Sequence, residues 1–235
     1  YTGSGIYRDV WLIAAPEIRL AQWGTGWHAT SLTNRQATIA VDMEVQKHIA
    51  TNDRLELSAT LYDAAGKQVA QRRTRVSDGK EGITKENLTL KITNPHRWNL
   101  DDPYLYTLKT ELLSNGQRID GCETKVGLRT LKFDPNKGFA LNDNWMKVKG
   151  VCLHHDAGVL GAVVPPEVWE RRLNNLKEIG VNAIRMSHNP QAPVVYDLCD
   201  RLGLLIMDEA SDEWEFPKRK WVKGWNKGEP AYDGS

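Results

Sequence analysis

The sequence lacks the features that mark several large classes of protein. It has no excess of one charge, because 31 Lys and Arg stand against 30 Asp and Glu for a net charge of +1. This balance disfavours nucleic acid or an anionic membrane as a partner. No apolar run approaches the roughly 18 residues that a membrane-spanning helix needs, and no glycine-rich loop of the phosphate-binding kind occurs. The remaining class is a globular protein, for which a hydrophobic share of 40% is ordinary.

Cysteine is also scarce. The three residues Cys122, Cys152 and Cys199 are widely spaced and match neither a CxxC metal pattern nor a disulfide framework. Because free cysteine is among the most often buried residues, we expect buried free thiols. An initiator methionine and a signal peptide are lacking too, so we expect an excised part of a longer chain. Secreted and cytoplasmic locations stay equally open.

From about residue 17 to residue 131 apolar and polar residues alternate. Apolar residues occupy every second position in 39–45, 55–61 and 88–92, which marks strands with one buried face. Turn signals such as Ser114-Asn115-Gly116 separate the runs. Short strands at this spacing predict an immunoglobulin-like β-sandwich.

We therefore place the sandwich at 16–131. Residues 1–15 are interpreted as the end of a preceding domain, forming its last strand, and 132–150 as a hairpin that turns near Asn142-Asp143-Asn144. The third region, 132–235, begins with this hairpin.

After Gly150 the apolar spacing becomes helical between short apolar runs. The predicted elements, in order, are a strand at 148–153, a helix opened by Pro165-Pro166 and ended by Gly180, a strand at 181–184, a helix through Val195–Leu202 ended by Gly203, and a strand at 204–207. Strands that alternate with helices predict parallel βαβ units.

Polar side chains follow each of these strands. In chain order they are His154, His155 and Asp156, then Arg185, His188 and Asn189, then Asp208 and Glu209, with Glu213 and Trp214 close behind. Because ligands gather at the carboxyl ends of parallel strands, we expect these side chains to form one binding rim. Arginine, histidine, amide and carboxylate groups hydrogen-bond hydroxyls, and tryptophan stacks on a sugar ring, so the rim favours a carbohydrate.

Simpler interpretations stay open for parts of the rim. Arg185 could form a purely structural ion pair with Asp208-Glu209. His154-His155 could be a satisfied core histidine beside an exposed one. A metal site is a third alternative, although the spacing matches no zinc signature.

Four segments carry a resemblance to a known family. "GVNAIRMSHNPQAPVVYDLCDRLGLLIMDEASDEW" closely resembles the barrel signature of glycoside hydrolase family 2, which contains β-galactosidases, β-glucuronidases and β-mannosidases. "KGVCLHHD" resembles the first barrel strand of that family, and "GIYRDVWL" the close of its sugar-binding domain, a jelly-roll. "NPHRWNLDDPYLYTL" is similar to a segment of its middle domain. The resemblance implies an immunoglobulin-like β-sandwich followed by the first βα units of a truncated (β/α)8 TIM barrel.

The resemblance also implies a chemistry, retaining hydrolysis of β-glycosides by two carboxylates. The family carries its acid/base in an Asn-Glu pair after a later strand and its nucleophilic Glu later still. No such pair follows the third strand here, so both are expected beyond residue 235 and no catalytic residue is assigned. Arg185 would brace the nucleophile, and His188 would contact sugar hydroxyls.

Other positions follow the family less closely. His154, His155 and Asp156 lie where first-strand residues meet the sugar. Glu213 falls where some β-galactosidases ligate magnesium, but Glu215 stands where those enzymes have histidine. No cofactor is required by this interpretation, and magnesium is an expectation for the parent enzyme only.

The sequence thus predicts part of a β-galactosidase-like enzyme, inactive by itself, whose parent acts on a β-galactoside and forms a homo-oligomer. A β-glucuronidase or β-mannosidase parent is an alternative. A non-catalytic carbohydrate-binding or adhesion module that uses the sandwich and its tryptophans is another. A partial barrel would expose its third strand, so we expect self-association.

Overall fold

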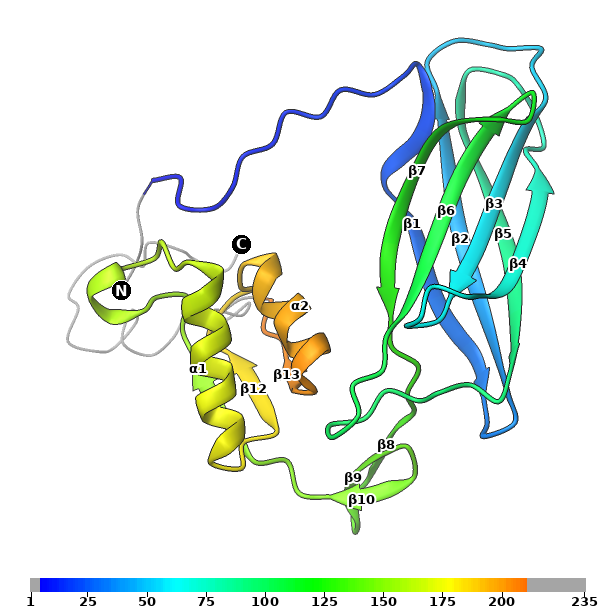
Figure 1. Cartoon of the computed structure of the whole chain (residues 1–235). Coiled ribbons are helices and arrows are strands. Elements are labelled where there is room, and N and C mark those ends of the chain that lie inside the picture. Colours follow the sequence, from blue (N-terminus) through cyan, green and yellow to red (C-terminus); the bar gives the residue numbers. More distant parts are fainter. Residues whose placement is uncertain (1–4, 211–235) are drawn as a thin grey trace. The chain divides into compact units, whose positions relative to one another are not determined.

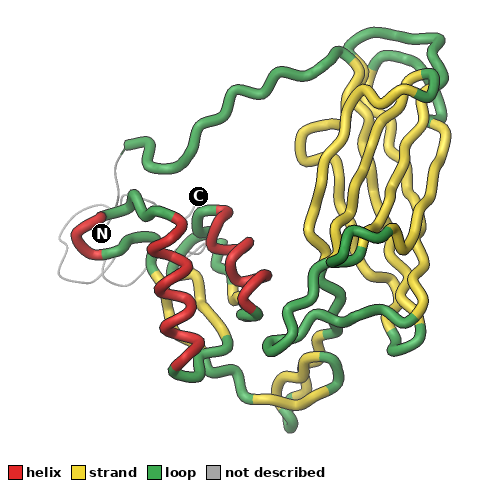
Figure 2. Tube along the Cα trace, viewed as in Figure 1, coloured by secondary structure: helices red, strands yellow, loops and turns green. Residues whose placement is uncertain are grey.

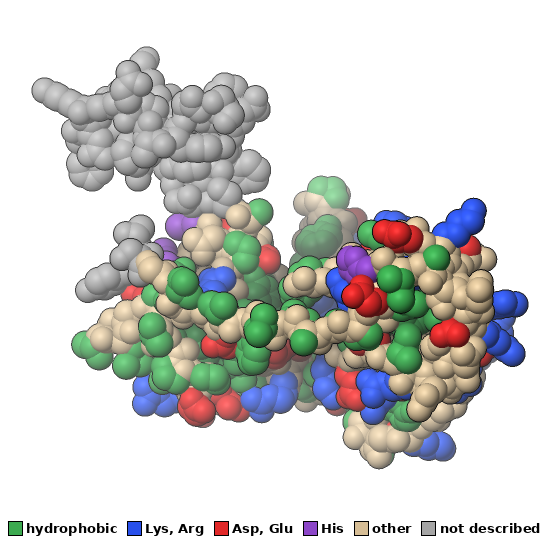
Figure 3. Space-filling model, turned by 90° about the horizontal axis from the view of Figure 1, so that it is seen from above, with side chains coloured by type: hydrophobic (Ala, Val, Ile, Leu, Met, Phe, Trp, Pro, Cys, Tyr) green, Lys and Arg blue, Asp and Glu red, His purple; other side chains and the backbone are tan. Residues whose placement is uncertain are grey.

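The computed structural model describes residues 5–210. The chain divides into two compact units, which we call the sandwich unit (Val10–Lys147) and the α/β unit (Tyr1–Asp9 with Val148–Ser235). Within the described residues, helices occur only in the α/β unit (Figure 2). None of these helices has the length and apolar character needed to cross a membrane. Acidic and basic side chains are interspersed over the visible surface (Figure 3), in keeping with the net charge of +1.

Two antiparallel sheets form the sandwich of the sandwich unit (Figure 1). The three-stranded sheet has the order β1-β2-β5 and the four-stranded sheet the order β4-β3-β6-β7. Their strands are β1 (Ile18–Leu32), β2 (Gln36–Lys47), β3 (Leu55–Tyr62), β4 (Gln68–Arg75), β5 (Gly82–Thr93), β6 (Tyr106–Ser114) and β7 (Gln117–Val126). The alternation in the sequence therefore predicted the sandwich correctly.

The core of the sandwich unit lies between the sheets. Residues from both sheets, including Val41 and Leu90 from one and Leu57 and Leu108 from the other, belong to one buried cluster. Val41 and Leu57 are completely inaccessible to solvent. Such burial contributes roughly 1.5–3 kcal/mol per large side chain, so these alternating positions hold the sheets together.

Residues 132–150 form more strands than the predicted hairpin. A small sheet of order β10-β9-β8 contains β8 (Leu131–Asp134), β9 (Gly138–Leu141) and β10 (Asn144–Met146). The predicted turn is present, because Asn142 and Asp143 adopt φ of 51° and 70° between β9 and β10. The second turn, closed at Gly138 with φ 83°, was not predicted, although Asp134, Pro135 and Asn136 before it are turn-forming residues.

The N-terminal residues differ from the expectation of a strand. Residues 5–17 contain no helix or strand in this structure. A strand exists only when its backbone groups pair with a neighbouring strand, and none of the described strands pairs with this segment.

The described part of the α/β unit has three parallel strands in the order β11-β12-β13. Its elements are β11 (Gly150–Leu153), a 3-10 helix η1 (Gly158–Leu160), α1 (Pro166–Glu178), β12 (Ala183–Met186), α2 (Pro193–Leu202) and β13 (Leu205–Met207). Both helices begin at a proline, and Gly180 and Gly203 follow their ends with φ of 90° and 75°. The predicted βαβ pattern and its helix boundaries are confirmed.

The second strand begins and ends later than predicted. Its register pairs Arg185 with Cys152 and Met186 with Leu153. Arg185 is therefore inside β12 and does not follow it. Val181 remains outside the strand because its amide bonds the carbonyl of Leu176 at the end of α1.

One face of this sheet is covered by the helices. Leu153, Ile184 and Met186 share a buried cluster with Trp169 of α1 and Leu198 of α2. Alternate residues point to opposite faces of a strand, so Cys152, Arg185 and Met207 lie on the other face, where all three are exposed.

The expectation of buried thiols was wrong for two cysteines. All three are free, but Cys122 and Cys152 are exposed and only Cys199 is buried. Cys122 lies on β7, at the edge of the four-stranded sheet, and Cys152 lies on the uncovered face of β11. Cys199 faces the sheet from α2, so its place in the apolar spacing predicted its burial.

Candidate functional site

The carboxyl ends of β11, β12 and β13 bring part of the predicted rim together. Because the strands are parallel and in register, the segments after Leu153, Met186 and Met207 leave the sheet at the same edge. The amide of Ser187 bonds the carbonyl of Leu153 at 3.0 Å, which ties the second segment to the end of the first strand. The peptide bond between Ser187 and His188 is cis.

Glu209 is the centre of the cluster. One carboxylate oxygen, Oε1, accepts hydrogen bonds from the guanidinium of Arg185, and the other, Oε2, lies 2.7 Å from Nδ1 of His188. The side chain of Glu209 is 17% exposed, whereas those of Arg185 and His188 are 44% and 41% exposed. A largely covered carboxylate therefore orients two exposed hydrogen-bonding groups.

The surroundings shift the pKa of both partners in the ion pair. Burial alone would raise the pKa of Glu209, but hydrogen bonds from His188 and Arg185 hold it below its ordinary value. The hydrogen bond to Glu209 raises the pKa of Arg185. The pair is therefore charged at neutral pH.

The hydrogen bond to Glu209 also sets the chemistry of His188. Since a carboxylate only accepts hydrogen bonds, Nδ1 of His188 carries the proton in this contact. In the neutral ring Nε2 is then an acceptor, and it has no partner among the described residues. His188 can thus accept a hydrogen bond from a hydroxyl group.

Cys152 also belongs to the cluster, which no pattern of residues predicted. Its Sγ lies 3.7 Å from Nη1 of Arg185. The nearby hydroxyl of Ser187 and guanidinium of Arg185 lower the pKa of the thiol. The register of β11 and β12, which pairs Cys152 with Arg185, creates this contact, and a register between distant strands is not visible in a residue pattern.

The histidines after β11 take two different positions. His154 meets His188 edge to face, with ring centroids 5.5 Å apart. His155 stacks on Tyr7 at 5.7 Å, and its Nε2 is buried without a partner among the described residues. His154 therefore joins the cluster around Glu209, and His155 contacts the N-terminal segment.

The remaining predicted residues lie apart from this cluster. Asp208 accepts a hydrogen bond from the hydroxyl of Tyr196 at 2.8 Å, because neighbouring residues of an extended chain point in opposite directions. Asp156 is held through its backbone carbonyl, which accepts from Arg172 at 2.7 Å. Asn189 is exposed.

Three further residues surround the rim and were missed. Tyr7 stacks on His155, Arg8 donates to the carbonyl of Pro190 at 2.8 Å, and Tyr196 bonds Asp208. The position of Tyr196 in the first turns of α2 was a usable signal, whereas nothing in the sequence indicated that residues 7–8 contact this rim.

Glu213 and Trp214 lie outside the described residues, so the proposed magnesium ligand has no structural test. Within 5–210 no group of three or more His, Cys, Asp and Glu side chains is arranged to hold a metal ion. The described donors therefore do not fit a metal, and we assign no step to one.

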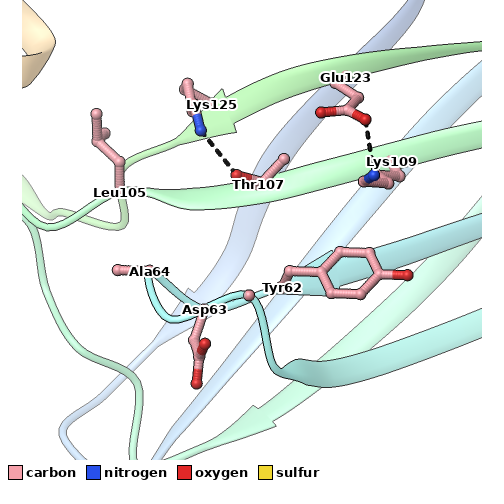
Figure 4. A pocket seen from close by; sticks show the side chains of 9 residues that line it. Tyr62, Asp63, Ala64, Leu105, Thr107, Lys109, Glu123 and Lys125 are labelled. Atoms are coloured by element: carbon pink, nitrogen blue, oxygen red, sulfur yellow. Dashed lines mark hydrogen bonds and ion pairs between the residues drawn. The ribbon is translucent and has the colours of Figure 1, made fainter.

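A groove on the sandwich unit lies outside the rim. It has a volume of about 440 Å³ and is lined in part by Tyr62, Lys109, Glu123 and Lys125 (Figure 4). Lys109 pairs with Glu123 at 2.7 Å and Lys125 donates to Thr107 at 2.9 Å. None of the predicted site residues lines it.

Comparison with known proteins gives the same family over both units. The family model for glycosyl hydrolases family 2 matches residues 25–129, and the model for the TIM barrel domain of that family matches 135–219. A β-galactosidase from Bacteroides ovatus is 43% identical over 93% of this chain, and a β-glucuronidase from Bacteroides fragilis is 32% identical over 87%. The chain spans 26% and 30% of these two relatives.

A solved structure supports the same assignment. The crystal structure of a glycosyl hydrolase family 2 member from Bacteroides cellulosilyticus matches with a TM-score of 0.87 and 34% identity, over 93% of this chain and 28% of that one. The two units are an immunoglobulin-like sandwich and the first βα units of a TIM barrel, in the order in which the two family models match. This chain belongs to glycoside hydrolase family 2.

Proposed function

We propose that this chain forms part of a retaining β-galactosidase that hydrolyses terminal β-galactosides. The observation that carries the proposal is the cluster at the carboxyl ends of β12 and β13, where Glu209 binds both Arg185 and His188. The identity of 43% to a β-galactosidase favours galactose as the sugar.

In this proposal the cluster positions substrate and performs no bond cleavage. Nε2 of His188 accepts a hydrogen bond from a sugar hydroxyl, and Arg185 presents its exposed N–H groups toward the reacting carboxylates. Glu209 keeps both groups in place. The two carboxylates that retaining hydrolysis requires lie outside these residues, so the 235-residue chain alone does not turn over substrate.

The test compares the 235-residue chain with the full-length protein on 4-nitrophenyl β-galactoside. We expect turnover by the full-length protein only. Replacing Arg185 with Met in that protein should lower kcat/KM roughly 100-fold, because small displacements of positioned groups have effects of this size. Arg201, which pairs with Glu170 at 2.8 Å on the helical surface, provides the control, and Arg201→Met should leave kcat/KM unchanged.

Two results would contradict the proposal. Robust turnover by the isolated 235 residues would place the catalytic groups inside this chain. Equal activity of Arg185→Met and Arg201→Met would remove Arg185 from the positioning cluster.

A β-glucuronidase is the second candidate, since one relative at 32% identity carries that name. A glucuronide has a carboxylate that needs a cation. The guanidinium of Arg185 is already paired with Glu209, which favours a neutral sugar. Higher kcat/KM of the full-length protein on 4-nitrophenyl β-glucuronide than on the galactoside would establish the second candidate.

We also propose that the complete enzyme is a homo-oligomer. A complete barrel would enclose the face of the α/β sheet on which Met207 is 61% exposed. This face therefore favours self-association of the 235-residue chain alone, and the homo-oligomer of the complete enzyme rests on the expectation for the parent enzyme. Light scattering that shows a monomer at high concentration, for the chain and for the full-length protein, would contradict this.

A further inference from the structure

Strand β1 contains a bulge that displays one tryptophan. Leu20 pairs with Val45 of β2, and the next pair joins Thr25 to Met43, so β1 advances further than β2 between them. Trp23 lies in this bulge with φ 60° and is 94% exposed. A bulky residue rarely adopts positive φ, and such outliers cluster at functional positions.

The bulge is fixed against β2 by the glycine that follows. A Cβ at Gly24 would lie 2.7 Å from Cβ of Ala21 and 2.9 Å from Cβ of Glu44. Only glycine allows this close approach without displacing backbone. The chain therefore holds the segment after Trp23 directly against Glu44, on the outer face of the three-stranded sheet.

A groove of hydrogen-bonding side chains begins at Glu44. It has a volume of about 360 Å³ and is lined by Asp42, Met43, Glu44, Lys85, Glu86 and Asn87. Asn87 donates to Asp42 at 2.7 Å, and Lys85 pairs with Glu44 at 2.6 Å. These cross-strand pairs fix the side chains in place, and each carboxylate has a second oxygen that can accept from a ligand.

We propose that Trp23 and this groove form a carbohydrate-binding site for a neutral oligosaccharide, separate from the candidate active site. We call it the Trp23 site, consisting of Trp23, Asp42, Glu44, Lys85 and Asn87. The exposed indole stacks on the apolar face of one sugar ring. The carboxylates, amide and ammonium bond the hydroxyls of that ring or the next.

The charges decide the class of ligand. On the outer face of the sheet the carboxylates of Asp42 and Glu44 outnumber the single lysine, Lys85, so an anionic glycan is disfavoured. A protein partner is disfavoured as well, because the centres of protein interfaces are depleted in Asp, Glu and Lys. A neutral glycan can stack on the indole ring of Trp23 and also form hydrogen bonds with the polar side chains of the groove.

Calorimetric titration of the 235-residue chain with β-1,4-galactan oligosaccharides and with cello-oligosaccharides tests the proposal. We expect binding of at least one of them, and a loss of roughly tenfold or more in affinity for Trp23→Ala, as is common when an aromatic anchor is removed. Trp23→Phe should retain part of the affinity, since the ring face remains. Trp145→Ala is the matched control, because Trp145 is also exposed in the sandwich unit but contacts Lys137 away from this groove.

Unchanged thermal unfolding of the variants will show that each is folded, as expected for a side chain that is 94% exposed. A blue shift of tryptophan fluorescence on titration, absent in Trp23→Ala, would support stacking.

The proposal is overturned if wild-type protein binds neither glycan, or if Trp23→Ala and Trp145→Ala bind equally well. It is also overturned if Trp23→Ala abolishes self-association without changing glycan binding, because Trp23 would then anchor a protein interface. The titration measures no turnover, so its result is independent of the proposed galactosidase activity.

Discussion

The sandwich unit and the α/β unit use their sheets in different ways. In the sandwich unit each sheet turns its apolar face to the other sheet, and the buried cluster takes residues from both. In the α/β unit the helices cover one face only, and Cys152, Arg185 and Met207 lie exposed on the other. The covered faces of the sheets hold the apolar packing that stabilises the fold. The uncovered face of the α/β sheet carries the polar groups that lead to the cluster around Glu209.

The largest effect on stability is expected from the sandwich core. Leu57→Ala removes a completely buried side chain and leaves a cavity, so it should lower the free energy of unfolding of the sandwich unit by about 2–5 kcal/mol. Leu173→Ala in α1, also completely buried, is the matched change in the α/β unit. Differential scanning calorimetry should show that each substitution shifts a different transition.

This pair of variants can break the comparison. If both substitutions lower the same transition by the same amount, the two units unfold together as one cooperative body. Their stabilities would then not be independent. A shift by Leu57→Ala without any by Leu173→Ala would mean that the helices of the α/β unit contribute little packing energy.

A smaller effect is expected from acid, and it concerns the cluster on the uncovered face. The folded pKa of Glu209 lies below the ordinary value of 4.5, so its ionised form is stabilised by folding. This contribution is fully present above pH 4.5 and is lost as the pH falls through the lowered pKa. The α/β transition should therefore lose stability on acidification below this range.

Glu209→Gln supplies the comparison within the same unit. The amide keeps the shape but not the charge, so the variant should be less stable than wild type at neutral pH and converge on it in acid. Thermal unfolding followed from pH 7 to pH 3 measures both curves. Parallel curves over the whole range would show that Glu209 does not contribute to the acid sensitivity.

The two units also differ in how far their structure could be predicted from sequence. Strict alternation, as in 39–45, predicts both a strand and its buried face. Pro165-Pro166 predicted the start of α1, and the glycines after α1 and α2 predicted where both helices end. The second turn at Gly138 was missed although Asp134, Pro135 and Asn136 before it are turn-forming residues, because only one turn was assigned to this region. The exposure of Cys122 was missed because it depends on β7 being a sheet edge.

The sequence predicted at which edge of the sheet the candidate site lies, but not which side chains contact one another there. That His154, Arg185, His188 and Glu209 gather there follows from parallel strand ends. Their pairing does not, since the contact of Cys152 with Arg185 depends on register and that of Asp208 with Tyr196 on the packing of α2. Residue types and spacing locate such a site, and the three-dimensional contacts assign its bonds.

The last prediction concerns the two cysteines of the α/β unit and should leave stability unchanged. Burial raises the pKa of Cys199 to about 12, whereas the nearby hydroxyl of Ser187 and guanidinium of Arg185 lower that of Cys152. Because the thiolate is the reactive form, iodoacetamide at neutral pH should label Cys152 much faster than Cys199. Peptide mass spectrometry over a time course measures both rates.

Arg185→Met separates the effect of charge from that of exposure. It removes the guanidinium near Cys152, so labelling of Cys152 should slow, while exposed Cys122 in the sandwich unit should react as before. Equal rates at Cys152 and Cys199 in wild-type protein would mean that α2 opens readily from the sheet. The covered and uncovered faces of the α/β sheet would then not be distinct environments, and the comparison would hold only for the sandwich unit.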